Sequence, residues 1–338
     1  MKDLIIISNE KIYFDSKSFF CDNIDLKSTP EGLSKNFTIH LIARSTKKKR
    51  AFKIENKLIK INIFSNIFSF LNKIKKLEKK NKKILVISIS PYTFLASIIL
   101  SFFKKEYFIY LRSDGFKEYE SILGFFGPFI YGFMFSICSK FSNLISCNEK
   151  ILRKKLGKIV YPSQLSNIWF YSQKEIEPTN PKLLYVGRLR EEKGIFSLIE
   201  ILKKDTSLNL NIVGSDNLEK SIQVPKNITI NLIEKNEKNL IKIYDEHNIF
   251  ILPSFTEGHP MVVLESLARL RPVIIFDDIS HVATNKIGIF ICKRNLSDLK
   301  EKINYIMQNY INIQDQIKKN ILPSKEKFLT DLTNIISK

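Results

Sequence analysis

The segment VGRLREEKG, residues 186–194, places two cations five residues apart where an apolar, strand-like run ends. Gly187 ends the run, Arg188 follows in the turn, and Lys193 with Gly194 precedes the next helical pattern. A diphosphate has dispersed negative charge, so it is bound best by a forked guanidinium, an ammonium and helix-end amides acting together. We therefore predict a diphosphate site at this turn. The alternative is a solvated loop in which both cations pair with the two glutamates between them.

The segment FTEGHPMVVLESLARLRPVI, residues 255–274, holds two glutamates separated by seven residues, Glu257 and Glu265. Pro260 suits a first helical turn, which puts Glu257 at a strand exit and Glu265 one to two turns into the helix. A carboxylate buried there needs hydrogen-bond donors, and a pair of ribose hydroxyls would supply them. A salt bridge from Glu265 to Arg269, four residues on, is the alternative.

A third candidate loop, RSDG at residues 112–115, follows the apolar run YFIYL. Because it would lie at the carboxyl end of a strand, Arg112 or Asp114 is a candidate contact for an acceptor or a sugar. An Asx-type turn completed by Gly115 explains the same residues without a ligand, and both interpretations stand.

These loops need a scaffold, and the hydrophobic pattern predicts an α/β one. Strand-like runs alternate with longer helical patterns, at residues 4–7, 37–43, 84–89, 107–111 and 144–147 and again at 183–187, 208–214, 228–233, 249–253 and 273–276. Such alternation indicates parallel sheets with crossover helices. A chain of 338 residues is long enough for two domains. The polar, proline-bearing stretch between the two series predicts an N-terminal lobe at 1–162, a linker at 163–181 and a C-terminal lobe at 182–322.

A formal charge of +20 is the most unusual bulk property of the chain. A surplus of this size attracts polyanions, which include nucleic acid, anionic lipid headgroups and phosphorylated substrates. Only nine of the 54 basic residues are Arg, so a codon bias toward A and T explains the many lysines equally well. No nucleic-acid-binding motif is present and the aromatic residues lie in apolar runs, so we rank a basic nucleic-acid-binding protein low.

The four cysteines are far apart and show no CxxC or His-coupled spacing, so neither a zinc site nor a disulfide framework is expected. Met1 is followed by the acid-containing MKDLIIIS and not by a basic region with a long apolar core. We therefore expect a cytoplasmic protein.

Two segments bear on membrane contact. Apolar residues recur at helical spacing from Ile67 to Leu77 among lysines, which favours a crossover helix over a helix lying on an anionic leaflet. Residues 122–138, ILGFFGPFIYGFMFSIC, are very apolar but fewer than the ~20 residues that span a bilayer. Because Pro128 suits a first helical turn, we favour a buried core helix there over shallow membrane contact. The charge excess nevertheless predicts peripheral association with the inner face of the cytoplasmic membrane.

The first two motifs together resemble those of the retaining GT-B glycosyltransferases of the family 4 type, the glycosyl transferases group 1. GRLREEKG is similar to their GRLxxxKG turn, and EGHPMVVLE is similar to their motif of two glutamates flanking seven residues. The similarity extends over residues 183–276, with IVGSD near 212–216 in the place of a second phosphate-side loop. It implies two Rossmann-like, doubly wound lobes that face a central cleft. It also implies that residues 323–338 form a C-terminal helix that packs back on the N-terminal lobe.

The resemblance further implies a role for each site residue. Arg188 and Lys193 would hold the donor diphosphate, and both would share catalysis with Glu257. Glu257 would bind hydroxyls of the transferred sugar, and Glu265 would bind the ribose. The other donor contacts would be Gly187, Gly214, Gly258, His259, Met261 and Val262. The family needs no metal and no cofactor beyond its nucleotide-sugar co-substrate, because the two cations neutralise the leaving diphosphate.

The sequence departs from the family pattern in three places. The stretch ISNEKIYFDSKSFF after the first strand has no glycine where the family has a Gly-rich loop. Leu270 replaces a frequent glycine, and ISHVA at 279–283 replaces a turn that contains Gly and Glu. The first departure concerns the acceptor side, whereas donor binding is less affected.

The sequence thus predicts a retaining, metal-independent glycosyltransferase of the hexosyl type. Its donor would be a nucleotide-diphosphate sugar, and its acceptor a lipid-linked glycan or a cell-surface polysaccharide such as lipopolysaccharide or capsule. Another GT-B enzyme, such as a nucleotide-sugar epimerase, is the main alternative.

Overall fold

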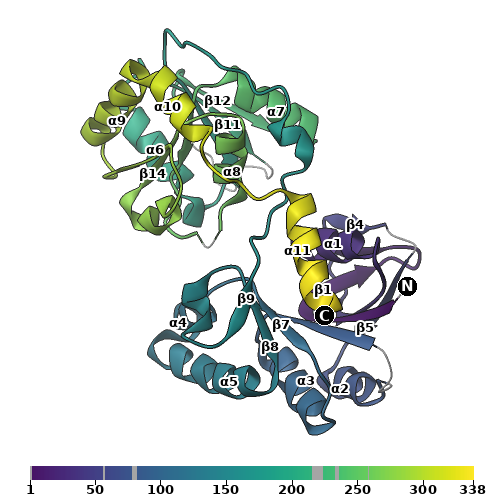
Figure 1. The fold of residues 1–338 in the computed structure, drawn as a ribbon. Helices are drawn as coiled ribbons and strands as arrows, with labels where there is room; N and C mark the ends of the chain where they lie inside the picture. The colour runs from purple at the N-terminus through teal and green to yellow at the C-terminus, as the bar shows by residue number, and fades with distance from the viewer. Residues whose placement is uncertain (1, 56–57, 78–81, 215–223, 233–235, 258) are drawn as a thin grey trace. The chain divides into compact units, whose positions relative to one another are not determined.

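A computed structural model describes residues 2–55, 58–77, 82–214, 224–232, 236–257 and 259–338. The chain divides into two units. The first comprises Met1–Gln164 together with Pro323–Lys338, and the second comprises Leu165–Leu322. Each unit has one sheet with helices packed against it (Figure 1).

The sheet of the first unit is mainly parallel. Its strands are β1 (Lys2–Phe14), β2 (Phe19–Cys21), β3 (Phe37–Thr46), β4 (Phe52–Ile54), β5 (Ile59–Phe64), β6 (Lys82–Ile87), β7 (Phe108–Leu111), β8 (Asn143–Ser146) and β9 (Gly157–Ile159). The parallel strands follow the order β5-β3-β1-β6-β7-β8-β9, and β2 and β4 continue antiparallel from the end of β1. This sheet is doubly wound, and the direction of the strand order reverses between β1 and β6.

Helices cover both faces of this sheet (Figure 1). They are α1 (Ile24–Leu33), α2 (Ile67–Lys75), α3 (Pro91–Phe102), α4 (Gly115–Leu123), α5 (Gly127–Phe141) and α11 (Lys325–Ser337). Successive residues of a strand point to opposite faces. In β1, Leu4 and Ile6 share a core with α1 and α11, whereas Ile5 and Ile7 share a core with α2, α3 and α5. Residues 323–338 therefore complete one face of the first unit.

The sheet of the second unit is parallel throughout the part that the structure describes. Its strands are β10 (Lys182–Gly187), β11 (Asn209–Gly214), β12 (Ile228–Leu232), β13 (Ile249–Leu252), β14 (Val273–Phe276) and β15 (Ile289–Cys292). They follow the order β12-β11-β10-β13-β14-β15, which is the 3-2-1-4-5-6 order of a Rossmann fold. The order reverses between β10 and β13, and ligands of doubly wound sheets bind at that point.

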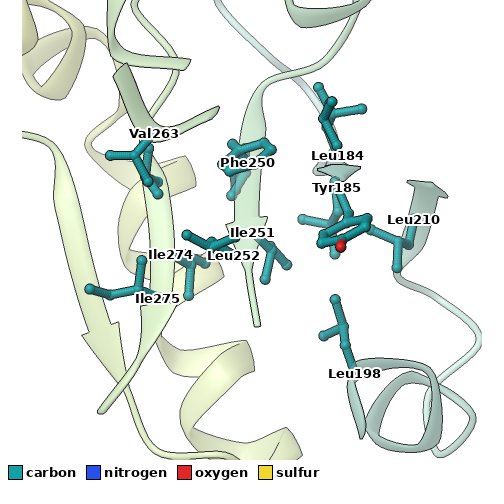
Figure 2. Close-up of a cluster of buried hydrophobic side chains, with 14 of the residues drawn as sticks. Leu184, Tyr185, Leu198, Leu210, Phe250, Ile251, Leu252, Val263, Ile274 and Ile275 are labelled. Atoms are coloured by element: carbon teal, nitrogen blue, oxygen red, sulfur yellow. The ribbon is translucent and has the colours of Figure 1, made fainter. Parts of the chain in front are cut away.

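The second unit has a core of almost wholly apolar strands under its helices. These helices are α6 (Ile195–Leu202), α7 (Glu237–Glu246), α8 (Met261–Ala268), α9 (Leu296–Gln308) and α10 (Tyr310–Ile317). Figure 2 shows side chains from neighbouring strands side by side in this core, with Leu198 of α6 and Val263 of α8 packed beside them. Strands covered on both faces need apolar residues at nearly every position, which is why these runs could be recognised from sequence.

The predicted linker at 163–181 is not a free connector over most of its length. Trp169, in the 3-10 turn Asn167–Phe170, is 2% exposed. The buried Arg269 donates to the carbonyl oxygens of Trp169, Tyr171 and Ser172. Polar and proline residues suggested a linker, but a guanidinium distant in sequence binds this backbone and makes it part of the second unit.

A β-hairpin stands where the family has its Gly-rich loop. β1 continues to Phe14 and pairs antiparallel with β2, with Tyr13 opposite Phe20. Ser16 lies in the connection with a φ of 75°, and Ile12 before it is fully buried. The first strand therefore runs on in place of a loop, and no glycine is needed at its expected end.

The apolar stretch at 122–138 is not the buried core helix that its sequence favoured. α4 ends at Leu123, and the 3-10 turn Gly124–Phe126 leads into α5, so the stretch turns a corner. One face of α5 buries Tyr131, Met134, Phe135 and Cys138. The other carries exposed aromatic rings, with Phe129 at 66% and Phe133 at 64% exposure. Pro128 does lie in the first turn of the helix, as expected, but the sheet covers only one of its faces.

Candidate functional site

The candidate site begins at the carboxyl ends of two neighbouring strands. β10 and β11 end side by side, with Gly187 paired in register with Gly214. A Cβ on Gly187 would lie 2.7 Å from the hydroxyl oxygen of Tyr185, so a side chain would disturb the strand end. Two glycines in this position leave backbone groups at the edge of the sheet open to a ligand.

Gly194 allows the loop after β10 to touch the loop after β13. Its φ is 64°, and a Cβ there would lie 1.9 Å from the carbonyl oxygen of Pro253. The backbone N–H of Phe255 donates to the carbonyl oxygen of Glu192 at 3.1 Å. A left-handed backbone and a contact this close both require glycine. The glycine of the KG pair therefore brings the two sequence motifs together.

Lys193 and Glu257 form an ion pair across the point where the strand order reverses. Lys193 Nζ lies 2.6 Å from Glu257 Oε1, and the side chains are 20% and 9% exposed. Ser254 Oγ donates to the same Oε1 at 2.7 Å. Among the residues that the structure describes, none donates to Glu257 Oε2. The carboxylate is thus fixed through one oxygen and keeps the other available to accept hydrogen bonds.

Arg188 lies at the exit of β10 with its side chain exposed. Its carbonyl oxygen accepts a hydrogen bond from Tyr185 Oη at 2.7 Å, which fixes the backbone of the turn. No group in the described part of the chain forms a hydrogen bond or ion pair with its guanidinium. Neither Arg188 nor Lys193 makes the local pair with Glu191 or Glu192 that a solvated loop would show.

Glu265 lies on α8, one to two turns after the position of Glu257, and is half-buried. Tyr244 Oη donates to Glu265 Oε2 at 2.9 Å. Burial, with the nearby charge of Glu265, raises the pKa of Tyr244 well above its usual value, so the phenol remains a donor. One oxygen of Glu265 is therefore oriented by a buried tyrosine in a way that suits a carboxylate holding hydroxyls.

The alternative role of Glu265, an ion pair with Arg269, is not supported. Arg269 Nε and Nη2 donate to Asp245 at 2.9 and 2.8 Å. Its remaining N–H groups bind the carbonyl oxygens of residues 169, 171 and 172. All five donors of this guanidinium are thus engaged elsewhere.

The other predicted donor contacts lie around the start of α8. Pro260 is the residue before the helix, and Met261 and Val262 are half-buried in its first turn. The first N–H groups of a helix have no partner within the helix, so this end favours an anion. His259 is exposed, and Gly258 lies outside the described residues.

Two residues that contact the Glu257 loop were not predicted from the sequence. His281 was not among the predicted site residues, and its Nε2 lies 2.8 Å from the carbonyl oxygen of Glu257. Arg294 follows β15 and pairs with Asp278 at 2.6 Å. Its guanidinium lies 4.2 Å from the ring centre of Phe255, which belongs to the same loop as Glu257. Neither residue stands in a recognisable motif, so only its position in space shows that it supports this loop.

In the first unit, Arg112 and Asp114 follow β7 but do not share one network. Arg112 pairs with Glu10 at 3.6 Å and with Asp25 at 3.5 Å. Asp114 caps α4 by accepting from the backbone N–H of Phe116 at 3.1 Å, and it pairs with Arg153 at 3.3 Å. The capping role matches the alternative of an Asx-type turn. A contact of either residue with an acceptor stays a prediction.

A metal site and a disulfide were not expected from the sequence. Over the described ranges, no three His, Cys, Asp or Glu side chains gather in a group that could hold a metal ion. The cysteines are free thiols, with Cys21, Cys138 and Cys292 buried and Cys147 half-buried.

Comparison with known proteins shows the fold of the chain, and a family model matches part of it, within the second unit. Residues 167–322 match the family described as Glycosyl transferases group 1. An uncharacterized glycosyltransferase of Haemophilus influenzae is 28% identical in an alignment 155 positions long, which covers 40% of this chain and 43% of that protein. The capsular polysaccharide biosynthesis glycosyltransferase CapM of Staphylococcus aureus is 30% identical in an alignment 138 positions long, which covers 37% of this chain and 36% of CapM. The aligned part thus spans less than half of either relative.

Among solved structures, Anabaena HepE in complex with UDP superposes with a TM-score of 0.71 at 12% identity, over 99% of both chains. At that identity the likeness establishes the fold. The chain therefore has the GT-B fold, as the resemblance of its motifs implied.

Proposed function

Because residues 167–322 match the glycosyl transferases group 1 on a GT-B fold, we propose that this protein is a glycosyltransferase with a nucleoside-diphosphate sugar donor. The observation that carries the proposal is the ion pair of Lys193 and Glu257 in the loops after β10 and β13, together with Gly187 and Gly214 at the paired ends of β10 and β11. A cation, a fixed carboxylate and open backbone edges meet where doubly wound sheets bind nucleotides.

The two cations would act on the leaving group. Cleavage of the sugar-phosphate bond concentrates negative charge on the departing nucleoside diphosphate, and charges already in place lower the barrier. Arg188 is exposed and has a forked guanidinium that can bind two oxygens at once. Lys193 has three N–H groups and uses one on Glu257, so it can bind phosphate without leaving the pair.

The two glutamates would divide donor recognition. Glu257 is tied by Lys193 and Ser254 through Oε1, and Oε2 would accept from hydroxyls of the sugar. Glu265, oriented by Tyr244, would accept from the ribose. Ribose contacts change little during the reaction, whereas contacts next to the reacting carbon are the ones that strengthen in the transition state.

The finer features follow from the resemblance and are part of the proposal. Transfer would occur with retention of anomeric configuration and without a metal, because the two cations take over charge neutralisation. CapM is named for capsular polysaccharide biosynthesis, and other relatives are named for O-antigen and teichuronic acid biosynthesis. We therefore propose a glycan acceptor, lipid-linked or part of a cell-surface polysaccharide, and action at the inner face of the cytoplasmic membrane.

Thermal unfolding in the presence of UDP-, GDP-, ADP- and TDP-sugars tests the donor proposal. A ligand that binds only the folded protein raises its melting temperature by mass action. We expect one nucleotide series to raise it in the presence of EDTA, and Lys193→Ala to abolish most of the increase. Lys203→Ala, which removes an exposed lysine of another ion pair, should respond like the wild type. An absence of response to every nucleotide would refute the proposal, and isomerised free donor without transfer would favour an epimerase.

A further inference from the structure

The helical hairpin of the first unit presents a wide aromatic surface that the sheet does not cover. We define the aromatic face as Phe125, Phe126, Phe129, Ile130 and Phe133. Exposure of these side chains runs from 46% for Ile130 to 76% for Phe125. Residues 126, 129, 130 and 133 recur at helical spacing, so they form one stripe opposite the buried residues of α5. Monomeric soluble proteins rarely expose a contiguous apolar patch of this kind without a partner for it.

The stripe continues onto the neighbouring helix. Phe133 packs edge-on to Phe94 of α3, with ring centres 6.1 Å apart. Further along α3, Ile98 is 40% exposed and Phe102 is 80% exposed. Figure 1 shows α2, α3 and α5 in a row along one side of the sheet, which agrees with their shared core. The apolar surface therefore extends beyond the hairpin.

The three helices α2, α3 and α5 carry charges of one sign. The sequences of α2, α3 and α5 contain no Asp or Glu. Lysines lie at their carboxyl ends: Lys73 and Lys75 in α2, Lys104 and Lys105 after α3, and Lys140 in α5. The three helices are crossovers between parallel strands, so these ends lie at the same edge of the sheet. The acids nearest in sequence are Glu106, before β7, and Glu118 and Glu120 on α4.

We propose that the aromatic face docks on a lipid bilayer with anionic headgroups and inserts its rings into the interfacial region. Aromatic and aliphatic side chains, with lysines at the carboxyl ends of the same row of helices and no acid within those helices, match an acyl boundary beneath negative phosphates. A protein partner would be expected to meet a mixed, polar rim.

The hairpin docks on the bilayer and does not cross it. By length and composition, Gly115–Phe141 is the one segment of the described residues that is apolar and long enough to span. It is bent at Gly124, and its two arms pack against each other, with Phe116 and Tyr131 ring centres 4.9 Å apart. A Cβ on Gly115 would lie 2.1 Å from the Tyr131 ring. The segment is therefore a closed hairpin that offers one side to the lipid.

Helix α4 connects the aromatic face to the candidate acceptor loop. Asp114 caps α4, and Arg153, its ion-pair partner, lies over the ring of Phe116 at 4.6 Å. Docking would thus hold the loop of Arg112 and Asp114 near the lipid surface. The position of this loop near the lipid rests on the proposed function, because it matters only for a lipid-linked acceptor. Docking itself does not rest on the proposed function.

Vesicle flotation separates docking from catalysis. We expect the wild-type chain to float with vesicles of phosphatidylcholine and phosphatidylglycerol, more weakly as phosphatidylglycerol is removed or salt is raised. The triple variant Phe126→Ser, Phe129→Ser and Phe133→Ser should lower the partition coefficient by about 100-fold or more, because each buried ring contributes about tenfold. Lys104→Glu with Lys140→Glu should remove the salt-sensitive part of binding.

The matched control is Leu156→Ser with Ile321→Ser, since these side chains are 97% and 95% exposed but lie outside the aromatic face. This control should bind vesicles like the wild type, and all variants should keep the thermal response to nucleotide. Flotation of the triple variant at the wild-type level would overturn the proposal, and so would equal loss in the control. A wild-type chain that is dimeric without vesicles, and monomeric as the triple variant, would assign the face to a second copy instead.

A depth measurement gives an independent answer. A tryptophan at Phe129→Trp should be quenched by brominated lipids, whereas the buried Trp169 of the wild type should not. Absence of quenching in bound Phe129→Trp would show that the rings stay outside the bilayer. This result is independent of whether any sugar is transferred, so failure of docking and failure of the proposed function can be told apart.

Discussion

Lys193 and Glu257 are partners that lie 64 residues apart in sequence, and their pairing defines the site. The motifs indicated both residues, but the local alternative for Lys193 was a glutamate one or two residues away. Lys193 pairs with Glu257 and not with Glu191 or Glu192 because Gly194 adopts a left-handed backbone. This conformation brings the loop after β10 against Pro253, in the loop that carries Glu257. Residue types and spacing thus predicted which side chains belong to the site. They did not predict which side chains pair, because the pairing depends on contacts between segments far apart in sequence.

The two glutamates should respond differently to loss of charge. Glu257→Gln keeps the shape of the side chain but weakens its bond with Lys193, so turnover should fall by roughly tenfold to 100-fold. Glu265→Gln should chiefly weaken donor affinity, because ribose contacts are nearly uniform between ground and transition states. Steady-state kinetics, with donor affinity measured by calorimetry, separates the two effects. The division of roles would be contradicted if Glu257→Gln chiefly weakened donor affinity and Glu265→Gln chiefly lowered turnover. Equal effects of either variant on turnover and on donor affinity would contradict it too.

Tyr244 gives a prediction that depends on pH. Tyr244→Phe removes the donor to Glu265 and should weaken nucleotide affinity by roughly threefold to tenfold. Because burial raises the pKa of Tyr244, the wild-type phenol stays protonated, and its contribution should persist through about pH 10. Calorimetric titration at several pH values checks both points, with the half-exposed Tyr305→Phe as the control. An affinity unchanged in Tyr244→Phe would remove Tyr244 from the site.

At the scale of elements, the central strands of both sheets were predicted, whereas β2, β4, β5, β9, β15 and the connections were not. The apolar runs of β10, β13 and β14 are buried on both faces, and this burial produces the signal that identified them. The stretch at 163–181 has no comparable apolar pattern. Its backbone is held by Arg269, about 100 residues away in sequence, and no local pattern reveals that contact. The same limit applies to α5, whose two faces look alike in sequence although only one is covered.

Arg269 should be more important for stability than for catalysis. Arg269→Ala leaves Asp245, whose side chain is 7% exposed, with only the longer contact to Arg271 at 3.8 Å, and frees three carbonyl oxygens. Breaking a buried ion pair in this way costs about 3 to 5 kcal/mol of unfolding free energy. Denaturant unfolding should show this loss, while Lys242→Ala at an exposed ion pair should change it by less than about 1 kcal/mol. A change in Arg269→Ala as small as in the control would mean that Asp245 is not dependent on the pair.

At the scale of the whole molecule, the chain leaves the first unit after Gln164 and returns to it at Pro323. The returning helix α11 is part of the core that contains Leu4 and Ile6, with Phe328, Leu332 and Ile336 buried. The family resemblance implied that this helix packs on the N-terminal lobe. The residues of the helix alone did not, because an amphipathic helix packs equally well on either sheet as far as its own residues show.

Leu332→Ala tests that placement. Removal of this fully buried side chain should lower the unfolding free energy of the first unit by about 2 to 5 kcal/mol. Asn334→Ala on the exposed face of the same helix should stay within about 0.5 kcal/mol of the wild type. Scanning calorimetry of the whole chain provides the comparison. Nucleotide binding by the second unit should survive in both variants, and loss of nucleotide binding with unchanged melting would contradict this account.

The most direct test of the central claim is donor turnover by the wild-type chain, Arg188→Ala and Lys193→Ala in the presence of EDTA. With the donor found by thermal unfolding, release of the nucleoside diphosphate should proceed in the wild type. It should fall by roughly tenfold to 100-fold or more in each variant, because charge on the leaving group grows toward the transition state. Wild-type rates in both variants, with donor affinity also intact, would show that the turn between β10 and α6 is only a solvated loop.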